Sequence, residues 1–184
     1  QEQTDRLLDT MDLDLSLYTV YRPANWGSGK KIPIVTWGNG TCAQPEGYAA
    51  LLRYVASQGF FVVAPNSRYA GTDMTQVHGL DFAFAANEDP TSPYYQKLDT
   101  TKVAAMGHSQ GGSATVATAN DPRVKTAILF NGGSNASKPY LTISGDRDIG
   151  GRVASALATE VDANPKAASL FYHMVPGTGA ADGH

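Results

Sequence analysis

The residues with the clearest chemical potential are 107–111, which read Gly-His-Ser-Gln-Gly. They fit the pattern G-x-S-x-G, in which a serine occupies a strained turn between a strand and a helix. Such a turn brings the strand and the helix so close together that side chains two positions before and after the serine do not fit, which explains Gly107 and Gly111. The pattern predicts Ser109 as a nucleophile, and the alternative is an ordinary strand-to-helix turn.

A serine hydroxyl is a weak nucleophile and needs a histidine base, which in turn needs a carboxylate to orient it. With this kind of elbow the chain order is serine, acid, histidine. An apolar run at 140–144 is followed by Gly145, Asp146, Arg147 and Asp148. We favour Asp148 as the acid because it lies beyond the tight turn. Asp146 is the alternative, and the carboxylate that is not catalytic would cap the turn or pair with Arg147.

The base must follow the acid in the chain, which leaves His173 and His184. His173 falls inside the apolar run 170–175, where a strand would hold it away from the carboxyl edge of the sheet. His184 lies 36 residues after Asp148 and beyond that strand, so we favour it. His78 precedes the nucleophile and is expected to be a surface histidine on a helix.

Acyl transfer also needs hydrogen-bond donors for the oxyanion. One is the backbone N–H of Gln110, at the start of a helix. The second is expected from the loop 38–42, where the Thr41 N–H is the best candidate; the alternative is an ordinary turn. This loop does not continue as G-x-G-x-x-G, because position 43 is alanine, and the segment 27–31 lacks the Ser or Thr of a phosphate-binding loop. Cys42 is expected to be a packing residue.

Strands and helices that alternate along the chain must position these groups. Strands are predicted over 17–21, 32–37, 60–64, 102–106, 124–130, 140–144 and 168–175, and helices over 46–58, 72–86, 113–120 and 152–161. This order predicts an α/β fold with a mostly parallel central sheet flanked by helices, in a single domain over residues 1–184. Each candidate group follows the carboxyl end of a predicted strand, the edge at which open α/β sheets bind ligands.

Composition excludes several other classes of function. The net charge is −3, and no basic run exceeds Lys30-Lys31, so neither nucleic acid nor an anionic membrane is an expected partner. The single cysteine forms no internal disulfide, and the four histidines lack metal-site spacing, so no metal or other cofactor is expected.

The chain resembles the α/β-hydrolases, and within them the polyester-hydrolase, cutinase-like and dienelactone-hydrolase-like serine esterases. Residues 38–41 (Gly-Asn-Gly-Thr), 56–60 (Ala-Ser-Gln-Gly-Phe) and 107–112 carry the resemblance, which covers about 32–184. It implies a secreted, cofactor-free esterase without a lid domain. The resemblance further implies Ser109, Asp148 and His184 as the triad, Thr41 and Gln110 as oxyanion donors, and His108 at the floor of the cleft.

Three features depart from that family. Its members continue past the histidine into a final helix, so we expect either that a C-terminal helix is missing from this chain or that the base is not His184. Asn131 lies where polyester-degrading relatives carry a tryptophan that grips aromatic substrates, and the paired C-terminal cysteines are absent.

Together these features predict a monomeric serine carboxylic-ester hydrolase for short-chain esters and polymeric esters. Gly40, Trp37, Tyr69 and His108 are expected to line its substrate cleft. Two alternatives remain: a serine peptidase or acyltransferase on the same fold, and a non-catalytic binding protein with an α/β-hydrolase-like fold.

Overall fold

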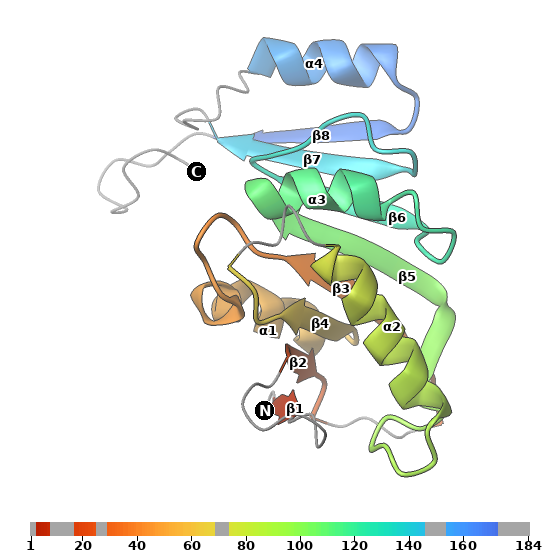
Figure 1. Ribbon diagram of the computed structural model, residues 1–184. Helices are drawn as coiled ribbons and strands as arrows, with labels where there is room; N and C mark the ends of the chain where they lie inside the picture. The colour runs from red at the N-terminus through yellow and green to blue at the C-terminus, as the bar shows by residue number, and fades with distance from the viewer. Residues whose placement is uncertain (1–2, 8–16, 25–28, 69–73, 146–153, 173–184) are drawn as a thin grey trace.

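A computed structural model describes residues 3–7, 17–24, 29–68, 74–145 and 154–172. Within these ranges, strands form one sheet in the order β1-β2-β4-β3-β5-β6-β7-β8 (Figure 1). The strands are β1 (Gln3–Leu7), β2 (Tyr18–Arg22), β3 (Ile32–Gly38), β4 (Phe61–Pro65), β5 (Leu98–His108), β6 (Thr126–Phe130), β7 (Tyr140–Gly145) and β8 (Ala167–Tyr172). The helices are the 3₁₀ turn η1 (Pro45–Tyr48), α1 (Ala49–Ser57), α2 (Thr75–Glu88), α3 (Gln110–Thr118) and α4 (Ala154–Ala163).

The strands from β3 to β8 all run parallel, whereas β2 pairs antiparallel with β4, and β1 antiparallel with β2. The mostly parallel sheet with flanking helices confirms the predicted fold class. Its register places Gly38 beside Gly107, and His108 beside Phe130. The ends of β3, β5 and β6 therefore meet at one edge of the sheet. This places the segments that carry Thr41 and Ser109 at the same edge, as predicted for these two groups.

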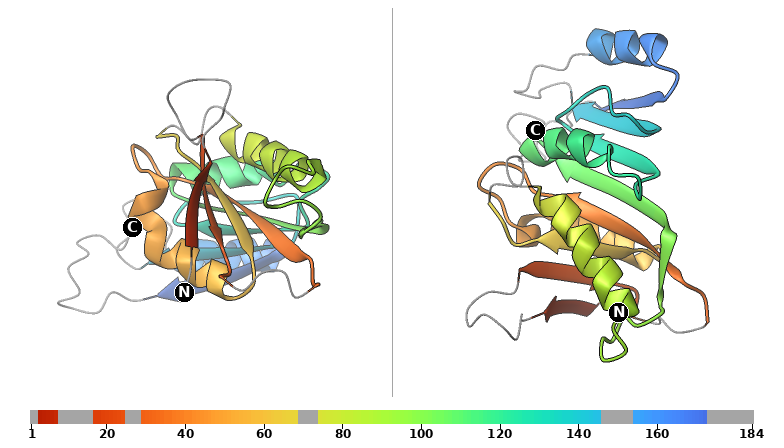
Figure 2. Two further views of the ribbon diagram at one scale, coloured as in Figure 1. Left: turned by 90° about the horizontal axis from the view of Figure 1, so that it is seen from below. Right: turned by 45° about the vertical axis from the view of Figure 1, so that its right-hand side comes forward.

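Two hydrophobic layers hold the helices to the sheet. On one face, Leu52 and Ala56 of α1 pack with Val35 and Trp37 of β3. On the other face, Leu80 of α2 packs in a separate cluster that includes residues of β3, β4 and β5. Figure 2 shows α1 on one side of the sheet and α2 with α3 on the other. Successive side chains of the central strands point to opposite faces of the sheet, and both faces are covered by helices. Nearly all positions of these strands are therefore buried or partly buried, which explains their nearly continuous apolar sequences.

Some element boundaries differ from the prediction. The helix predicted over 46–58 is divided into η1 and α1, with Pro45 at the start of the 3₁₀ turn. The strand predicted over 102–106 begins earlier, at Leu98; the intervening residues are polar, and Asp99 accepts hydrogen bonds from Thr101, as a turn residue would. Strand β1 was not predicted. The strand predicted over 168–175 is observed over Ala167–Tyr172, and the remainder of that range lies outside the described residues.

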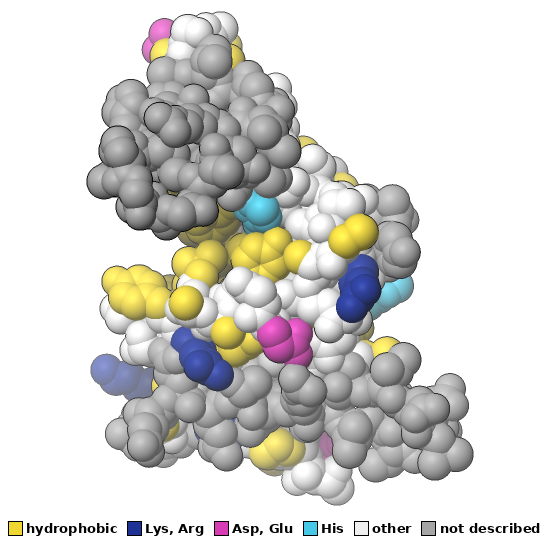
Figure 3. Space-filling view, turned by 90° about the vertical axis from the view of Figure 1, so that its left-hand side faces the viewer, with side chains coloured by type: hydrophobic (Ala, Val, Ile, Leu, Met, Phe, Trp, Pro, Cys, Tyr) yellow, Lys and Arg dark blue, Asp and Glu magenta, His cyan; other side chains and the backbone are white. Residues whose placement is uncertain are grey.

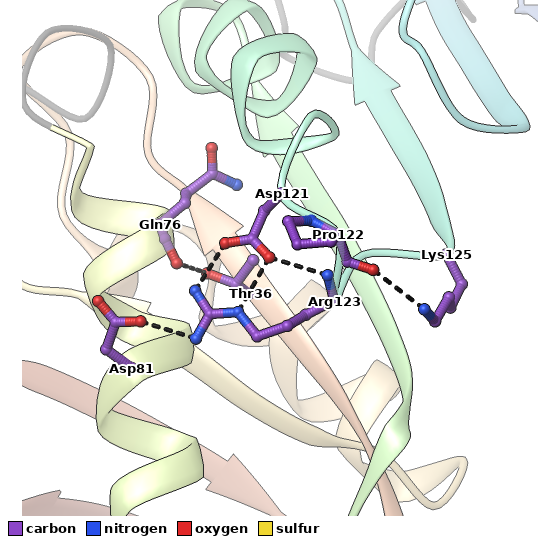
Figure 4. A network of polar contacts seen from close by, with 7 residues as sticks. All are labelled: Thr36, Gln76, Asp81, Asp121, Pro122, Arg123 and Lys125. Carbon is purple, nitrogen blue, oxygen red and sulfur yellow. Dashed lines mark hydrogen bonds and ion pairs between the residues drawn. The ribbon is translucent and has the colours of Figure 1, made fainter.

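Buried polar contacts join α2 to the centre of the sheet. Gln76 is 1% exposed, and its Nε2 donates to the Met106 carbonyl at 2.9 Å and to Thr115 Oγ1 at 3.0 Å. Thr36 Oγ1 donates to the backbone carbonyl of Gln76 at 2.8 Å (Figure 4). These bonds fix the start of α2 against β3, β5 and α3, close to the reactive edge.

A second polar group joins α2 to the turn after α3. Arg123 follows α3 and donates to Asp121 and to Asp81 of α2 (Figure 4). Its guanidinium lies 5.1 Å from the ring centre of Phe84. None of the described helices is long and apolar enough to cross a membrane.

Candidate active site

Ser109 occupies a strained backbone position between β5 and α3. Its φ is 53° and its ψ is −117°, a backbone conformation that residues other than glycine rarely adopt. Its N–H donates to the Phe130 carbonyl at 2.8 Å, and its own carbonyl accepts from the Ser113 N–H at 3.1 Å. The strand, sharp turn and helix predicted around Ser109 are therefore present.

Close backbone packing explains the glycines around this turn. A methyl group on Gly107 would lie 2.2 Å from the Gly111 carbonyl oxygen, and one on Gly111 would lie 2.1 Å from the Gly38 carbonyl oxygen. One on Gly132 would lie 2.1 Å from the Ser109 carbonyl oxygen. The predicted close approach of strand and helix is confirmed at Gly107, whereas the space at Gly111 is limited by the end of β3 instead. Gly132, in the loop after β6, is a third position that cannot carry a side chain.

The loop after β3 passes directly beside the serine. A methyl group on Gly40 would lie 3.5 Å from Ser109 Cβ. The Ala43 N–H donates to the Gly40 carbonyl and the Cys42 N–H to the Arg68 carbonyl, both at 3.1 Å. Within the described ranges, the Thr41 N–H has no hydrogen-bond acceptor. This loop therefore brings one unused backbone donor to the neighbourhood of the elbow.

The start of α3 supplies a second donor. Gln110 is the first residue of this helix, so its N–H has no carbonyl within the helix to bond. The helix dipole adds partial positive charge at the same place. The Gln110 side chain turns inward, and its Oε1 is buried without a hydrogen-bond partner among the described residues.

An apolar pocket of about 240 Å³ opens at the carboxyl edge of the sheet. It is lined by Trp37, Tyr48, Leu51, His108, Phe130, Asn131 and Ile143. Figure 3 shows this edge, where hydrophobic side chains gather beside a histidine. Among these lining residues only the imidazole can carry a charge at neutral pH, so the pocket suits an uncharged group.

Two predicted cleft residues, His108 and Trp37, line this pocket. His108 is half-buried, whereas Trp37 is fully buried, and its Nε1 donates to Asn39 Oδ1 at 3.0 Å. Gly40 is buried against His108 and Ser109. The structure thus brings Ser109, His108, Gly40 and Trp37 to one place.

Tyr48 is a site residue that the sequence did not single out. Its hydroxyl accepts from the Gly40 N–H at 3.0 Å and lies 3.0 Å from His108 Nδ1. Burial raises the pKa of the Tyr48 hydroxyl, partly offset by the bond from Gly40, so the phenol stays protonated at neutral pH. Its position in the sequence fits the helical spacing of the apolar residues on α1, so the pattern indicated a packing role and not a hydrogen-bonding one. Leu51, Phe130 and Ile143 were also missed, whereas Asn131 had been singled out through the family resemblance. A search for residues at the ends of parallel strands could have found Phe130 and Ile143.

The remaining predicted residues lie outside the described ranges: Tyr69, Asp146, Asp148, His173 and His184. The described chain reaches Gly145 at the end of β7 and Tyr172 at the end of β8, which are register partners. The predicted acids follow the first of these positions, and His173 follows the second.

Two other predictions concern residues near the site. Cys42 was expected to be a packing residue, which is wrong: its side chain is exposed, and its backbone has a φ of 58° within the turn after β3. The tight turn that holds the loop near Ser109 directs this side chain outward. His78 is exposed on α2, as predicted. Among the described residues, no group of three or more His, Cys, Asp or Glu side chains could hold a metal ion.

Comparison with known proteins adds an independent observation. The model of the family described as PETase, PET hydrolase-like, matches residues 17–165. The match includes β2 to α4 and thus the elbow, the loop after β3 and every lining residue of the pocket. A search of curated proteins finds no match.

Proposed function

The chain belongs to the PET hydrolase-like family, and on this premise we propose that it is a serine carboxylic-ester hydrolase with Ser109 as its nucleophile. One observation carries the proposal. Ser109 is held at a φ of 53° and directly follows His108, which lines an apolar pocket, and the loop after β3 is packed against the serine. Backbone strain of this kind costs about 1–3 kcal/mol and persists where surrounding packing imposes it, commonly at active sites.

The proposed reaction proceeds in two halves. Ser109 Oγ attacks the ester carbonyl carbon while a histidine removes the hydroxyl proton, and the same histidine then protonates the leaving alcohol. Water next attacks the acyl-enzyme, and the carboxylic acid formed from the acyl group is released. We assign the base to His184, with His173 as the alternative, and the orienting acid to Asp148, with Asp146 as the alternative.

Two backbone groups are proposed to stabilise the oxyanion. The Gln110 N–H lies at the start of α3, and the Thr41 N–H has no acceptor in the described part of the loop after β3. Donors of this kind act where negative charge develops in the transition state, and removing one costs about 100- to 1,000-fold in rate. No cofactor takes part in this scheme.

The pocket suggests the size and chemistry of the substrate. About 240 Å³ with mainly apolar walls suits a short acyl chain or a single ring, and is small for a bulky group. We therefore propose short-chain esters, together with exposed ester groups of a polyester, as substrates.

A panel of nitrophenyl esters of increasing acyl length, ending with a polyester film, tests the proposal. We expect the highest kcat/KM for short acyl chains and a loss of at least about 1,000-fold in Ser109→Ala. Ser113→Ala is the matched control, because Ser113 is an exposed serine on the same helix. Stoichiometric labelling of Ser109 by a fluorophosphonate is also expected.

The outcomes separate the alternatives. Ester hydrolysis by Ser109→Ala at the parent rate would refute Ser109 as the nucleophile. No labelling of Ser109 would instead favour a binding protein. Preference for amide substrates or for an added alcohol acceptor would instead indicate a peptidase or an acyltransferase. Parallel His184→Ala, His173→Ala, Asp148→Asn and Asp146→Asn variants assign the base and the acid.

A further inference from the structure

Tyr48 connects the two segments on which the proposed oxyanion site depends. It lies at the end of η1, and its hydroxyl contacts both the loop after β3 and the last residue of β5. The Gly40 N–H donates to this hydroxyl at 3.0 Å, and His108 Nδ1 lies 3.0 Å on its other side. Gly40 directly precedes the proposed donor Thr41, and His108 directly precedes Ser109.

The protons available at this contact fit both bonds. The Tyr48 oxygen uses one acceptor site for the Gly40 N–H and keeps its own proton, because burial raises the pKa of the phenol. That proton can be donated to Nδ1 of a neutral His108, whereas a protonated Nδ1 would donate to the phenol oxygen instead. The bond between the two side chains therefore persists in either protonation state.

The surrounding packing leaves the hydroxyl little freedom. A methyl group on Gly40 would lie 2.8 Å from the Tyr48 hydroxyl and 2.9 Å from His108 Nδ1. The Tyr48 ring is tilted against Trp37 at 4.9 Å and against His108 at 5.5 Å between ring centres. A shift of Tyr48 would therefore move the loop and the end of β5 relative to each other.

We infer that Tyr48 is a positioning residue for this site: its hydroxyl fixes the loop that carries the Thr41 N–H at a set distance from the elbow that carries Ser109. The inference rests on the proposed function. Because the Gly40 N–H is bonded to Tyr48, it is not an oxyanion donor itself, and this bond holds the peptide group that directly precedes the Gly40–Thr41 peptide. Tyr48 acts through the backbone and has no bond to the reacting atoms in this arrangement.

Tyr48→Phe tests the inference, because it removes the hydroxyl and keeps the ring packed on Trp37. Misplacing a transition-state donor lowers kcat more than it alters substrate binding. We expect kcat for a short nitrophenyl ester to fall about tenfold and KM to change less than twofold. Such a loss of rate is within the range that misplacing a catalytic group produces. The affinity for a trifluoromethyl ketone, which forms an oxyanion with the serine, should fall by the same factor as kcat/KM.

Tyr54→Phe is the matched control, since Tyr54 is 64% exposed on α1, and all its constants should be unchanged. If Tyr48→Phe fails to fold, Gly40→Ala strains the same contact from the other side and should produce the same split between kcat and KM. Unchanged kcat and ketone affinity in a folded Tyr48→Phe protein would overturn the inference while leaving the esterase proposal intact. An unaltered parent protein without esterase activity would instead refute the proposed function itself.

Discussion

Different kinds of contact hold the elements together at the two ends of the parallel strands, here called the carboxyl edge and the amino edge of the sheet. At the carboxyl edge, backbone groups of β3, β5 and α3 pack so closely that a methyl group on Gly111 would lie 2.1 Å from a carbonyl oxygen. At the amino edge, Arg123 joins α2 to the turn after α3 through charged side chains that are partly exposed. Backbone contacts fix positions to within tenths of an ångström, whereas partly exposed ion pairs adapt. The rigid form of contact thus occurs at the edge where we propose that the reaction takes place.

Gly111→Ala should have the largest effect on stability, because the added methyl group would meet the backbone of Gly38 and Asn39, which is held in the sheet by β3. We expect a loss of about 3 kcal/mol or more in the free energy of unfolding, measured by urea denaturation. In Gly47→Ala, the control, the added methyl group has no atom within 4 Å, and stability should change by less than about 0.5 kcal/mol. Equal stability of the two variants would contradict the contrast between the edges.

Gln76→Met should come next, since it removes the buried amide that bonds Met106 and Thr115. Leaving those groups with fewer partners is expected to cost about 2 kcal/mol. Gln58→Met, at an exposed position after α1, serves as the control. A Gln76→Met protein as stable as this control would show that the carboxyl edge depends on backbone packing alone.

Arg123→Met should have a smaller effect, because the two ion pairs that it removes are partly solvated. We expect a loss of about 1 kcal/mol that shrinks at high salt. Arg53→Met, at an exposed position on α1, is the matched control and should be neutral. A loss as large as that in Gly111→Ala would remove the distinction between rigid and adaptable edges.

The contribution of this ion pair should also depend on pH. Hydrogen bonds from Arg123 hold the pKa of the Asp121 carboxyl below its usual range. A carboxyl with a lowered pKa stabilises the folded state above its ordinary pKa of about 4, and this contribution is lost as the pH falls through the lower, folded-state pKa. The stability difference between the natural protein and Arg123→Met should therefore be full near pH 7 and decrease below about pH 4. An equal difference at pH 7 and pH 3 would exclude Asp121 as its source.

Much of the elbow could be predicted because its signal is local. Gly107, Ser109 and Gly111 lie within five residues, and the constraint that selects them acts over one turn of chain. The central strands were recognisable for a similar reason, since burial on both faces requires continuous apolar runs. Strand β1 escaped prediction, because a short edge strand pairs along one side only and its sequence, QTDRL, is mostly polar.

By itself, the sequence determined which residue is held in a strained turn and the class of fold that presents it, because both follow from neighbouring residues and their periodicity. Only the tertiary structure decided that Gly38 meets Gly111, and that Tyr48 reaches both Gly40 and His108. Tyr48 and His108 are 60 positions apart, and their contact depends on β3 lying between β4 and β5 in the sheet. Contacts across strands depend on the order of the sheet, which no local pattern of residues encodes.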